Sequence, residues 1–305
     1  MTLKYFVTGA SGQLGHDLLK ELNERGYDVT GSDIMNVNDG TFPAGCSYVP
    51  LDICDREKTL RTIKELSPDI IIHCAAWTNV DAAEENEELV RMVNVKGTEN
   101  IALAAKETDA KLIYISTDYV FDGKGQVPFD PDQSDFKPLN VYGTSKLEGE
   151  RCVSSLLDKY FIVRTSWVFG RNGNNFVKTM LRLGKTHDNV KVVNDQIGTP
   201  TYTPDLARLL ADMSLTDKYG CYHVTNSETE EGGYISWYDF AKEIFRQASY
   251  DTEVIPVSTE EYGLSKAVRP LNSRLDKQKL IRQGFKPLPD WKDALSRYLK
   301  ETEDL

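Results

Sequence analysis

Two side chains four positions apart, Tyr142 and Lys146, have the types and spacing needed to donate a proton to a carbonyl oxygen. If residues 141–157 form a helix, both side chains lie on one face. A free phenol has a pKa near ~10, too high for an efficient acid at neutral pH, and a neighbouring ammonium would lower it. Thr117 ends an apolar segment, and its hydroxyl is suited to hold the substrate oxygen. These residues predict carbonyl reduction by hydride transfer, with Lys146 also bonding the nicotinamide ribose, unless the pair simply lies on an exposed helix face.

The cofactor that this chemistry needs is indicated by a glycine-rich turn near the N-terminus. The apolar segment 4–8 runs into Gly9, Gly12 and Gly15, and leucines at helical spacing follow. The glycines permit, in order, a tight turn, a close approach of backbone to phosphate, and close packing of the helix on the strand. Asp33 ends the next apolar segment, close to the ~20-residue spacing of a ribose-binding carboxylate. We expect this turn to bind the pyrophosphate of a dinucleotide, although a glycine-rich turn with an unrelated surface aspartate has the same residues.

Regularly alternating strands and helices are expected to position these groups. The alternation continues to about residue 170 and predicts an α/β fold with a Rossmann-type, doubly wound parallel sheet and right-handed crossovers. Beyond Gly170 it breaks down. We expect residues 1–170 to form a dinucleotide-binding domain to which 193–226 returns, and residues 171–192 and 227–305 to form a smaller, interleaved substrate-binding lobe. The principal elements expected are strands at 27–33, 47–53, 68–76, 111–117, 160–169, 190–193, 222–224 and 253–257, and helices at 55–66, 90–108, 141–157, 174–183, 203–213, 236–248 and 291–300.

Two further strand ends are expected at the cofactor. The segment 68–76 is a continuous apolar strand of the kind found inside parallel sheets, and it ends in Ala75 and Ala76. These small side chains leave room at the carboxyl edge of the sheet, where ligands bind in open α/β sheets. Asp52 ends the segment 47–53 and either contacts an adenine or caps the next helix. The residues leave both roles open.

Composition restricts the class of protein. With 305 residues and a formal net charge of −11, the chain is not expected to be a general nucleic-acid binder, although a small anionic ligand is compatible with that charge. No apolar run approaches the ~20 residues of a membrane helix, and the first strand starts too early to leave room for a signal peptide, so we expect a cytoplasmic protein. The five cysteines include no C-x-x-C pair and are expected to be reduced, with Cys74 a small core residue.

The glycine motif with Ser116-Thr117 and Tyr142-x-x-x-Lys146 resembles the extended short-chain dehydrogenases/reductases. Five further blocks are more specific and together resemble the dTDP-4-dehydrorhamnose reductase family. These blocks are AAWTNVDAAE at 75–84, STDYVFDG at 116–123, RTSWVFG at 164–170, DQIGTPT at 195–201 and RPLNSRLD at 269–276. The resemblance extends from the first strand to the last helix.

This resemblance implies the reaction and the site. The family reduces dTDP-4-dehydro-β-L-rhamnose at C4 to dTDP-β-L-rhamnose with NADPH or NADH. It implies Tyr142 as proton donor, Lys146 as its partner and Thr117 as the tuning hydroxyl. Residues expected to bind the cofactor are Gly9, Gly12, Gln13, Leu14, Gly15, Asp33, Asp52, Ile53, Ala75, Ala76, Thr78, Tyr142 and Lys146. Residues expected to bind the sugar nucleotide are Thr117, Asp118, Tyr142 and Trp167, with core packing as the alternative for Trp167.

Several properties stay open at this point. Asp33 favours a free 2′-hydroxyl over a 2′-phosphate through like-charge repulsion, yet the family often accepts both cofactors. No complete metal-ligand set is matched, so we expect no metal, and the chain is expected to be a monomer or homodimer with no nucleic-acid or membrane partner. The alternatives are a reductase or epimerase for another nucleotide sugar, or a non-catalytic cofactor-binding regulatory subunit, as in methionine adenosyltransferase. A dehydratase is disfavoured because Asp118 is followed by Tyr119 rather than by a glutamate. The loop 36–45 has no assigned role.

Overall fold

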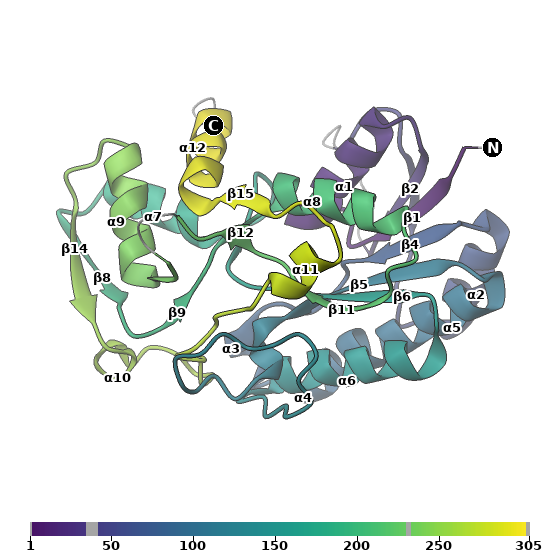
Figure 1. The fold of residues 1–305 in the computed structure, drawn as a ribbon, viewed down its shortest axis with the longest axis horizontal. Coiled ribbons are helices and arrows are strands. Elements are labelled where there is room, and N and C mark those ends of the chain that lie inside the picture. The colour runs from purple at the N-terminus through teal and green to yellow at the C-terminus, as the bar shows by residue number, and fades with distance from the viewer. Residues whose placement is uncertain (1, 35–41, 230–232, 303–305) are drawn as a thin grey trace.

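A computed structural model describes residues 2–34, 42–229 and 233–302. Most of the loop 36–45, to which the sequence assigns no role, lies outside these ranges. Figure 1 shows a helix-covered sheet at one end of the molecule and a smaller lobe of helices and short strands beside it. No helix of the described residues combines the length and apolar character needed to cross a bilayer.

The central sheet has seven parallel strands among the described residues, in the order β11-β6-β5-β4-β1-β2-β3. This parallel, doubly wound sheet confirms the predicted fold class. The carboxyl ends of β1, β4 and β5 lie side by side, which brings the glycine turn next to Ala75 and Thr117. The strands are β1 Lys4–Thr8, β2 Asp28–Asp33, β3 Ser47–Pro50, β4 Ile70–His73, β5 Lys111–Thr117, β6 Tyr160–Thr165 and β11 Gly220–His223.

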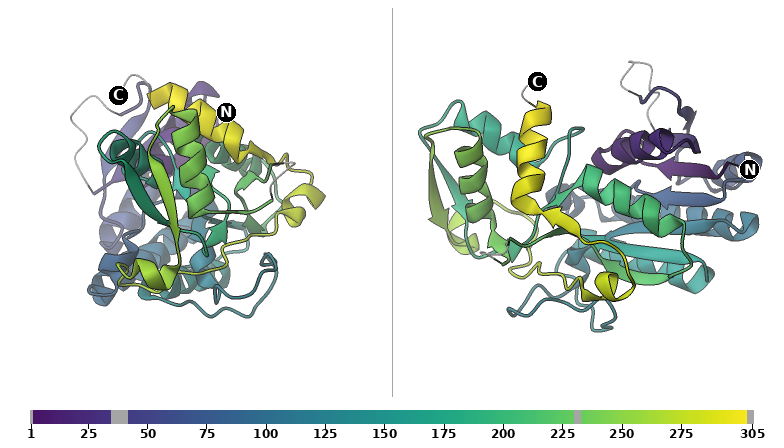
Figure 2. Two further views of the ribbon diagram at one scale, coloured as in Figure 1. Left: turned by 90° about the vertical axis from the view of Figure 1, so that its left-hand side faces the viewer. Right: turned by 45° about the horizontal axis from the view of Figure 1, so that its top comes forward.

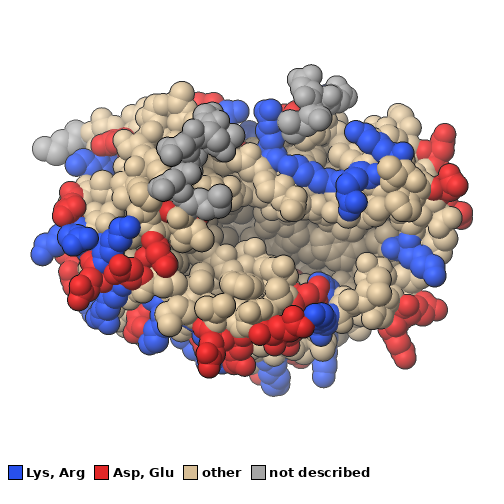
Figure 3. Space-filling model, turned by 180° about the vertical axis from the view of Figure 1, so that it is seen from behind, with Lys and Arg blue, Asp and Glu red and all other residues tan. Residues whose placement is uncertain are grey.

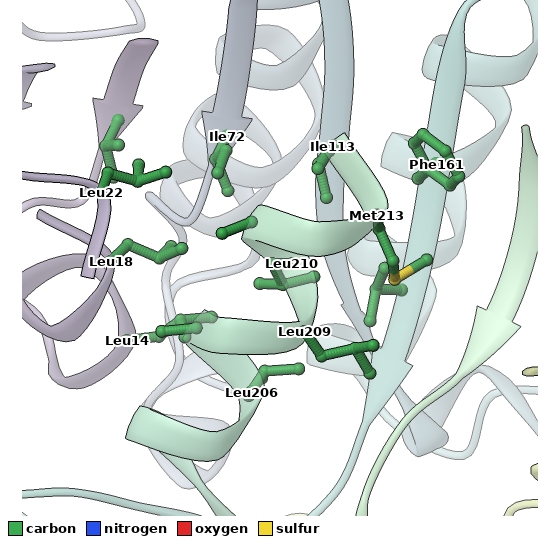
Figure 4. Close-up of a cluster of buried hydrophobic side chains, with 14 of the residues drawn as sticks. Leu14, Leu18, Leu22, Ile72, Ile113, Phe161, Leu206, Leu209, Leu210 and Met213 are labelled. Carbon is green, nitrogen blue, oxygen red and sulfur yellow. The ribbon is translucent and has the colours of Figure 1, made fainter. Parts of the chain in front are cut away.

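Helices cover both faces of the sheet (Figure 2). One face is covered by α1 (Gln13–Glu24), α8 (Thr203–Ser214) and α11 (Gln278–Arg282). Figure 4 shows the leucines of α1 and α8 meeting strand residues such as Ile72 and Phe161. The other face is covered by α2 (Arg56–Leu66), α5 (Thr98–Thr108) and α6 (Val141–Leu156). Because both faces are buried, the central strands are apolar throughout rather than alternating.

The helix predicted at 90–108 is divided in the structure. It consists of α4 (Glu87–Arg91), a π-helical segment (Met92–Gly97) and α5, and the short α3 (Val80–Ala83) precedes it. Asn94, in the π-helical segment, accepts a hydrogen bond from the Trp77 backbone N–H (2.7 Å) and donates to the Ser145 hydroxyl (2.9 Å). π-bulges of this kind are frequent at functional sites. This one ties the loop after β4 to α6.

The smaller lobe has its own apolar core. Buried side chains from α7 (Phe176–Gly184), α9 (Trp237–Gln247) and α12 (Trp291–Thr302) pack together, including Met180, Ile244 and Tyr298. The lobe also contains α10 (Thr259–Tyr262) and the parallel pair β8 (Asn189–Val193) and β14 (Glu253–Val257). The remaining pairs are β7 (Val168–Phe169) with β10 (Thr201–Tyr202), β9 (Ile197–Gly198) with β13 (Ile235–Ser236), and β12 (Asn226–Ser227) with β15 (Leu288–Asp290).

The single strand predicted at 160–169 is wrong. β6 leaves the central sheet after Thr165, Trp167 has a positive φ of 50°, and β7 pairs with β10 instead. The chain leaves the sheet here because residues 199–201, rather than a neighbouring strand of the sheet, form hydrogen bonds with Ser166 and Trp167. The Ser166 hydroxyl donates to the Thr199 carbonyl oxygen (2.9 Å), and the Thr201 N–H donates to the Trp167 carbonyl oxygen (3.2 Å). These long-range bonds carry the chain from the sheet into the smaller lobe.

Candidate active site

A cavity of about 610 Å³ lies at the carboxyl ends of the central strands. Its volume is in the range of ligand pockets, and its position is where open α/β sheets bind ligands. Figure 3 shows the molecular surface hollowed on the side opposite to the view of Figure 1. The structure brings all the predicted site residues to this one cavity, which is lined by Gly9, Gly12, Gln13, Leu14, Gly15, Asp33, Asp52, Ile53, Ala75, Ala76, Thr78, Thr117, Asp118, Tyr142, Lys146 and Trp167.

The glycine loop has the shape of a phosphate cradle. Gly9 has a φ of +68°, and a Cβ there would lie 2.7 Å from the Ala75 backbone nitrogen. A Cβ on Gly15 would lie 2.1 Å from the Gly9 carbonyl oxygen, so the close packing of α1 on this turn requires glycine. Gly12 is the N-cap of α1 and has no side chain to satisfy the first N–H groups, and no acidic residue occupies the first turn. Those N–H groups are available to an anion.

Asp33 is held beside this loop. It ends β2, and its carboxylate accepts hydrogen bonds from the backbone N–H groups of Ser11 (3.0 Å) and Ile34 (2.8 Å). Because Ser11 belongs to the glycine loop, these contacts fix the distance between the acid and the phosphate cradle. The position suits a carboxylate that accepts hydroxyl groups of an adenosine ribose.

Asp52 does not cap the following helix. The N-cap of α2 is Asp55, whose carboxylate accepts a hydrogen bond from the Lys58 N–H (3.0 Å). Asp52 accepts from the Cys54 N–H (2.9 Å) and lines the cavity. The capping alternative is therefore wrong, and contact between Asp52 and an adenine stays a prediction.

Helix α6 and strand β5 position the three residues predicted to carry the chemistry. Asn140 caps α6 by accepting the Gly143 N–H (2.8 Å), which places Tyr142 in the first turn and Lys146 one turn later. The Thr117 hydroxyl, at the end of β5, donates to Asp118 Oδ1 (3.0 Å) and accepts from the Tyr119 N–H (3.2 Å). All three side chains enter the same cavity.

The Tyr142 phenol has a raised pKa, because burial disfavours its anion; a hydrogen bond with the Thr117 side chain opposes this effect. Burial thus outweighs the lowering of this pKa that the sequence predicts, and the effect of Lys146 on the phenol stays a prediction. In this structure the Lys146 ammonium donates to the Ile115 carbonyl oxygen (2.7 Å). At neutral pH the phenol keeps its proton, which is the form that a proton donor requires.

Lys146 is buried, and the Tyr114 ring and the Glu150 carboxylate both stabilise its charged form. Its nitrogen lies 4.1 Å from the centre of the Tyr114 ring, within the range of a cation–π contact. Burial lowers the pKa of Lys146 to about 7, and the charge of Glu150 opposes that shift. The amine is thus poised to change its charge near neutral pH.

Glu150 is itself held in a buried network. Its carboxylate accepts two hydrogen bonds from the Arg164 guanidinium (2.8 and 2.7 Å) and one from the Ser116 hydroxyl (2.5 Å). The two charged side chains are only 5% and 3% exposed. This bidentate pair joins α6 to β6 close to the site. Glu150 lies one helical turn after Lys146, and its partner Ser116 directly precedes Thr117.

Asp118 supplies a further titratable group to the cavity wall. It is 2% exposed, and burial raises the pKa of its carboxyl to about 6, while hydrogen bonds from the Ser273 and Thr117 side chains oppose the shift. A carboxyl with this pKa can accept or donate a hydrogen bond near neutral pH. Ser273 belongs to the sequence block 269–276, so this block contributes a residue that contacts the wall of the cavity.

The cavity is also lined by residues that were not predicted from the sequence. Trp237 lies there with its ring stacked on that of Trp167, and Asn174, Ser166 and Thr165 are further examples. Ser166 and Thr165 belong to the block 164–170, whose resemblance to the family could have indicated that they line the site. Trp237 had none, because only the folding of α9 toward β6 brings it to the site. The described residues contain no group of three His, Cys, Asp or Glu side chains suited to hold a metal ion.

Comparisons with known proteins give matches that cover nearly the whole chain. The family model described as RmlD substrate binding domain matches residues 3–303. A dTDP-4-dehydrorhamnose reductase of Aggregatibacter actinomycetemcomitans is 40% identical over 96% of this chain and 97% of its own length. The spore coat polysaccharide biosynthesis protein SpsK of Bacillus subtilis (strain 168) is 38% identical over 98% of this chain and 97% of its own. The crystal structure of dTDP-4-dehydrorhamnose reductase from Bacillus anthracis in complex with NADP matches with a TM-score of 0.88 and 43% identity, covering 99% of this chain and 100% of that one.

Proposed function

The chain belongs to the dTDP-4-dehydrorhamnose reductase family, and from this premise we propose that it reduces the C4 ketone of dTDP-4-dehydro-β-L-rhamnose to the alcohol of dTDP-β-L-rhamnose with NADPH or NADH. The observation that carries the proposal is the meeting, in one cavity, of a phosphate cradle with Thr117, Tyr142 and Lys146. The substrate is accordingly a dTDP-linked 4-keto-6-deoxyhexose.

The residues of the cavity fit a dinucleotide. A pyrophosphate fits the glycine loop for two reasons. The loop leaves space that a Cβ on Gly9 or Gly15 would fill, and the start of α1 has no side-chain cap on its N–H groups. Asp33 would accept the adenosine ribose hydroxyls, and Asp52 with Ile53 would contact the adenine. Residues that would hold the remainder are Gln13 and Leu14 at the pyrophosphate, Ala75, Ala76 and Thr78 along the nicotinamide half, and Tyr142 and Lys146 at its ribose. When bound, the reduced nicotinamide supplies the hydride.

Tyr142 donates its proton to the C4 oxygen as negative charge develops there. Burial keeps the phenol protonated until that moment, because its raised pKa disfavours loss of the proton. Thr117 orients the same oxygen through its hydroxyl. Lys146 stabilises the phenolate that proton transfer leaves behind, and the burial of the Lys146 amine strengthens this charge pair.

The sugar nucleotide lies, in this proposal, between the central sheet and the smaller lobe. Asp118 accepts a sugar hydroxyl, and Trp167 bounds the sugar from the smaller-lobe side. We place the reaction in the cytoplasm and expect a monomer or homodimer that needs no metal, nucleic acid or membrane.

The test is oxidation of NADPH and of NADH, followed by absorbance, with dTDP-4-dehydrorhamnose supplied by coupled upstream enzymes. Oxidation with formation of dTDP-rhamnose is the expected result. No oxidation by a protein that still binds cofactor would contradict the proposal and favour a regulatory subunit or a reductase for another nucleotide sugar.

Tyr142→Phe tests the proton donor. Removing a general acid costs about 10²–10⁴-fold in rate, whereas the loss of one hydroxyl from the cavity wall should leave cofactor binding nearly unchanged. The two quantities are measured separately, by single-turnover kinetics and by a fluorescence titration with NADPH. A variant that keeps the wild-type rate would show that Tyr142 is not the donor.

A further inference from the structure

Trp237 has no role in the proposed mechanism, yet it lies in the same cavity as Thr117 and Tyr142. We propose that Trp237 is a substrate-positioning residue, which holds Trp167 in place and forms with it one aromatic wall against the hexose. The inference rests on the proposed function, since it concerns the sugar that the site would bind.

The two indoles form a close stack between the two parts of the molecule. Their ring centres are 3.8 Å apart, and the ring planes differ by 17°. Trp167 follows β6 of the central sheet, whereas Trp237 is the first residue of α9 in the smaller lobe. The stack therefore links the segment that leaves the central sheet after β6 to the smaller lobe.

Trp237 is well anchored for this purpose. Ser236 caps α9 in a reciprocal arrangement with Asp239, in which each side chain bonds the other residue's backbone N–H (both 3.0 Å). The preceding strand β13 pairs with β9, and the Phe176 ring packs 4.5 Å from the Trp237 ring. These contacts fix the start of α9, so the indole of Trp237 provides a firm surface for its neighbour.

Trp167 needs such a surface, because its backbone conformation is unfavourable. Its φ of 50° lies in the left-handed region, which bulky side chains rarely adopt. Such conformations persist only where the surroundings enforce them, and they gather at functional sites. Gly198 is the second restraint, since a Cβ there would lie 3.0 Å from Trp167 Cε2. The indole is thus confined by the Trp237 ring and by the backbone of β9.

The pair has the chemistry to recognise a deoxyhexose. The C–H groups and the methyl group of a 6-deoxy sugar pack well on aromatic rings. Both indoles are only half-buried, and the hydrogen bonds made within the described ranges include no acceptor for the N–H of either ring. Both N–H groups are therefore free to donate to sugar or phosphate oxygens, which adds directional contacts to the apolar wall.

The experiment compares Trp237→Leu, which removes the ring, with Trp237→Phe, which retains a stacking ring. We expect Trp237→Leu to raise the KM for the nucleotide sugar by about tenfold or more, with NADPH affinity unchanged, and Trp237→Phe to recover part of the loss. Gly198→Ala should raise the same KM, because its Cβ would lie 3.0 Å from both Trp167 Cε2 and Ser273 Cβ and would displace the indole. The matched control is Trp291→Phe, a buried tryptophan of the same lobe that does not line this cavity and should leave KM unchanged.

Binding of dTDP-rhamnose, measured by calorimetry, separates this inference from the proposed function. If the wild-type protein binds the product but oxidises no NADPH, the proposed function fails, and a tenfold weaker Kd in Trp237→Leu still supports the inference. A KM and Kd within twofold of wild type in Trp237→Leu overturn the inference alone. Equal losses of sugar and cofactor affinity, or no recovery in Trp237→Phe, would indicate a merely structural role and also overturn it. A wild-type protein that neither binds dTDP-rhamnose nor oxidises NADPH in the presence of dTDP-4-dehydrorhamnose overturns both.

Discussion

Glu150→Gln should destabilise this protein far more than a neighbouring charge-neutralising substitution on the same helix. The Glu150 carboxylate and the Arg164 guanidinium are 5% and 3% exposed and form two parallel hydrogen bonds. In the variant, an amide NH₂ group would face the guanidinium N–H groups, so Arg164 would keep its charge in a buried site without a counter-charge. Leaving one partner of a buried ion pair costs about 3–5 kcal/mol of the free energy of unfolding.

Glu148→Gln is the matched control. Glu148 lies on the same helix and pairs with Arg91, but these side chains are 29% and 42% exposed. Water and salt screen such pairs, so the control should lose no more than about 1 kcal/mol. The two variants have the same change of charge and differ in the burial of the pair and in the number of hydrogen bonds to the carboxylate.

The assay is equilibrium unfolding in urea, with the midpoint and slope measured for wild type and both variants. Since total stabilities are about 5–15 kcal/mol, the expected loss in Glu150→Gln is a large fraction of the whole and should move the midpoint clearly. Equal midpoints for the two variants would refute the reasoning, because burial would then not decide the cost.

A second readout links Glu150 to catalysis. The Glu150 charge raises the pKa of Lys146 against the effect of burial. Glu150→Gln should therefore lower that pKa below its value of about 7, and the loss of the protonated amine should occur at a more acidic pH in the rate profile. An unchanged pH profile in a folded variant would show that Glu150 acts on stability alone.

Three further predictions follow from the cavity wall. Asp33→Ser should raise the rate ratio of NADPH to NADH by about tenfold, because it removes like-charge repulsion toward a 2′-phosphate; an unchanged ratio would mean that Asp33 does not face that position. Asp118→Asn should gain stability relative to wild type as the pH rises from 3.8 to about 6, because burial favours the protonated carboxyl and the wild type loses that preference across this window; urea midpoints below and above it test the sign. Gly15→Ala should abolish NADPH binding in a fluorescence titration, since its Cβ would lie 2.1 Å from the Gly9 carbonyl oxygen, and retained affinity would contradict the tight packing of the loop.

Much of the fold was predictable because its signals are local. The apolar strands 68–76 and 111–117 and the glycine turn before α1 are each recognisable within a short window, and alternation of such units implies a parallel sheet. The spacing of Tyr142 and Lys146 predicts a shared helix face, and α6 has that helix from Val141 to Leu156. The roles assigned to these residues are still predictions for the experiments above.

The errors arose where long-range contacts compete with local preference. The stretch 160–169 has the composition of one strand, but hydrogen bonds from residues 199–201 turn it away from the sheet at Trp167. In sequence, Asp52 could either contact an adenine or cap the next helix, and only the observed helix start, which Asp55 caps, excludes the second role. Trp237 could not be selected, because its partner is far away in the chain.

The sequence by itself determined the alternation of strands and helices that builds the central sheet, the type of cofactor cradle and the identity of the residues that could donate a proton. Those properties depend on residue type and on spacings within a few turns or strands. Only the tertiary structure decided the environment of each group: the direction of the Tyr142 pKa, the support of Lys146 by Glu150, and the stack of Trp167 on Trp237. The reason is physical, since desolvation and charge pairing depend on distances between elements, and packing of the whole chain sets those distances.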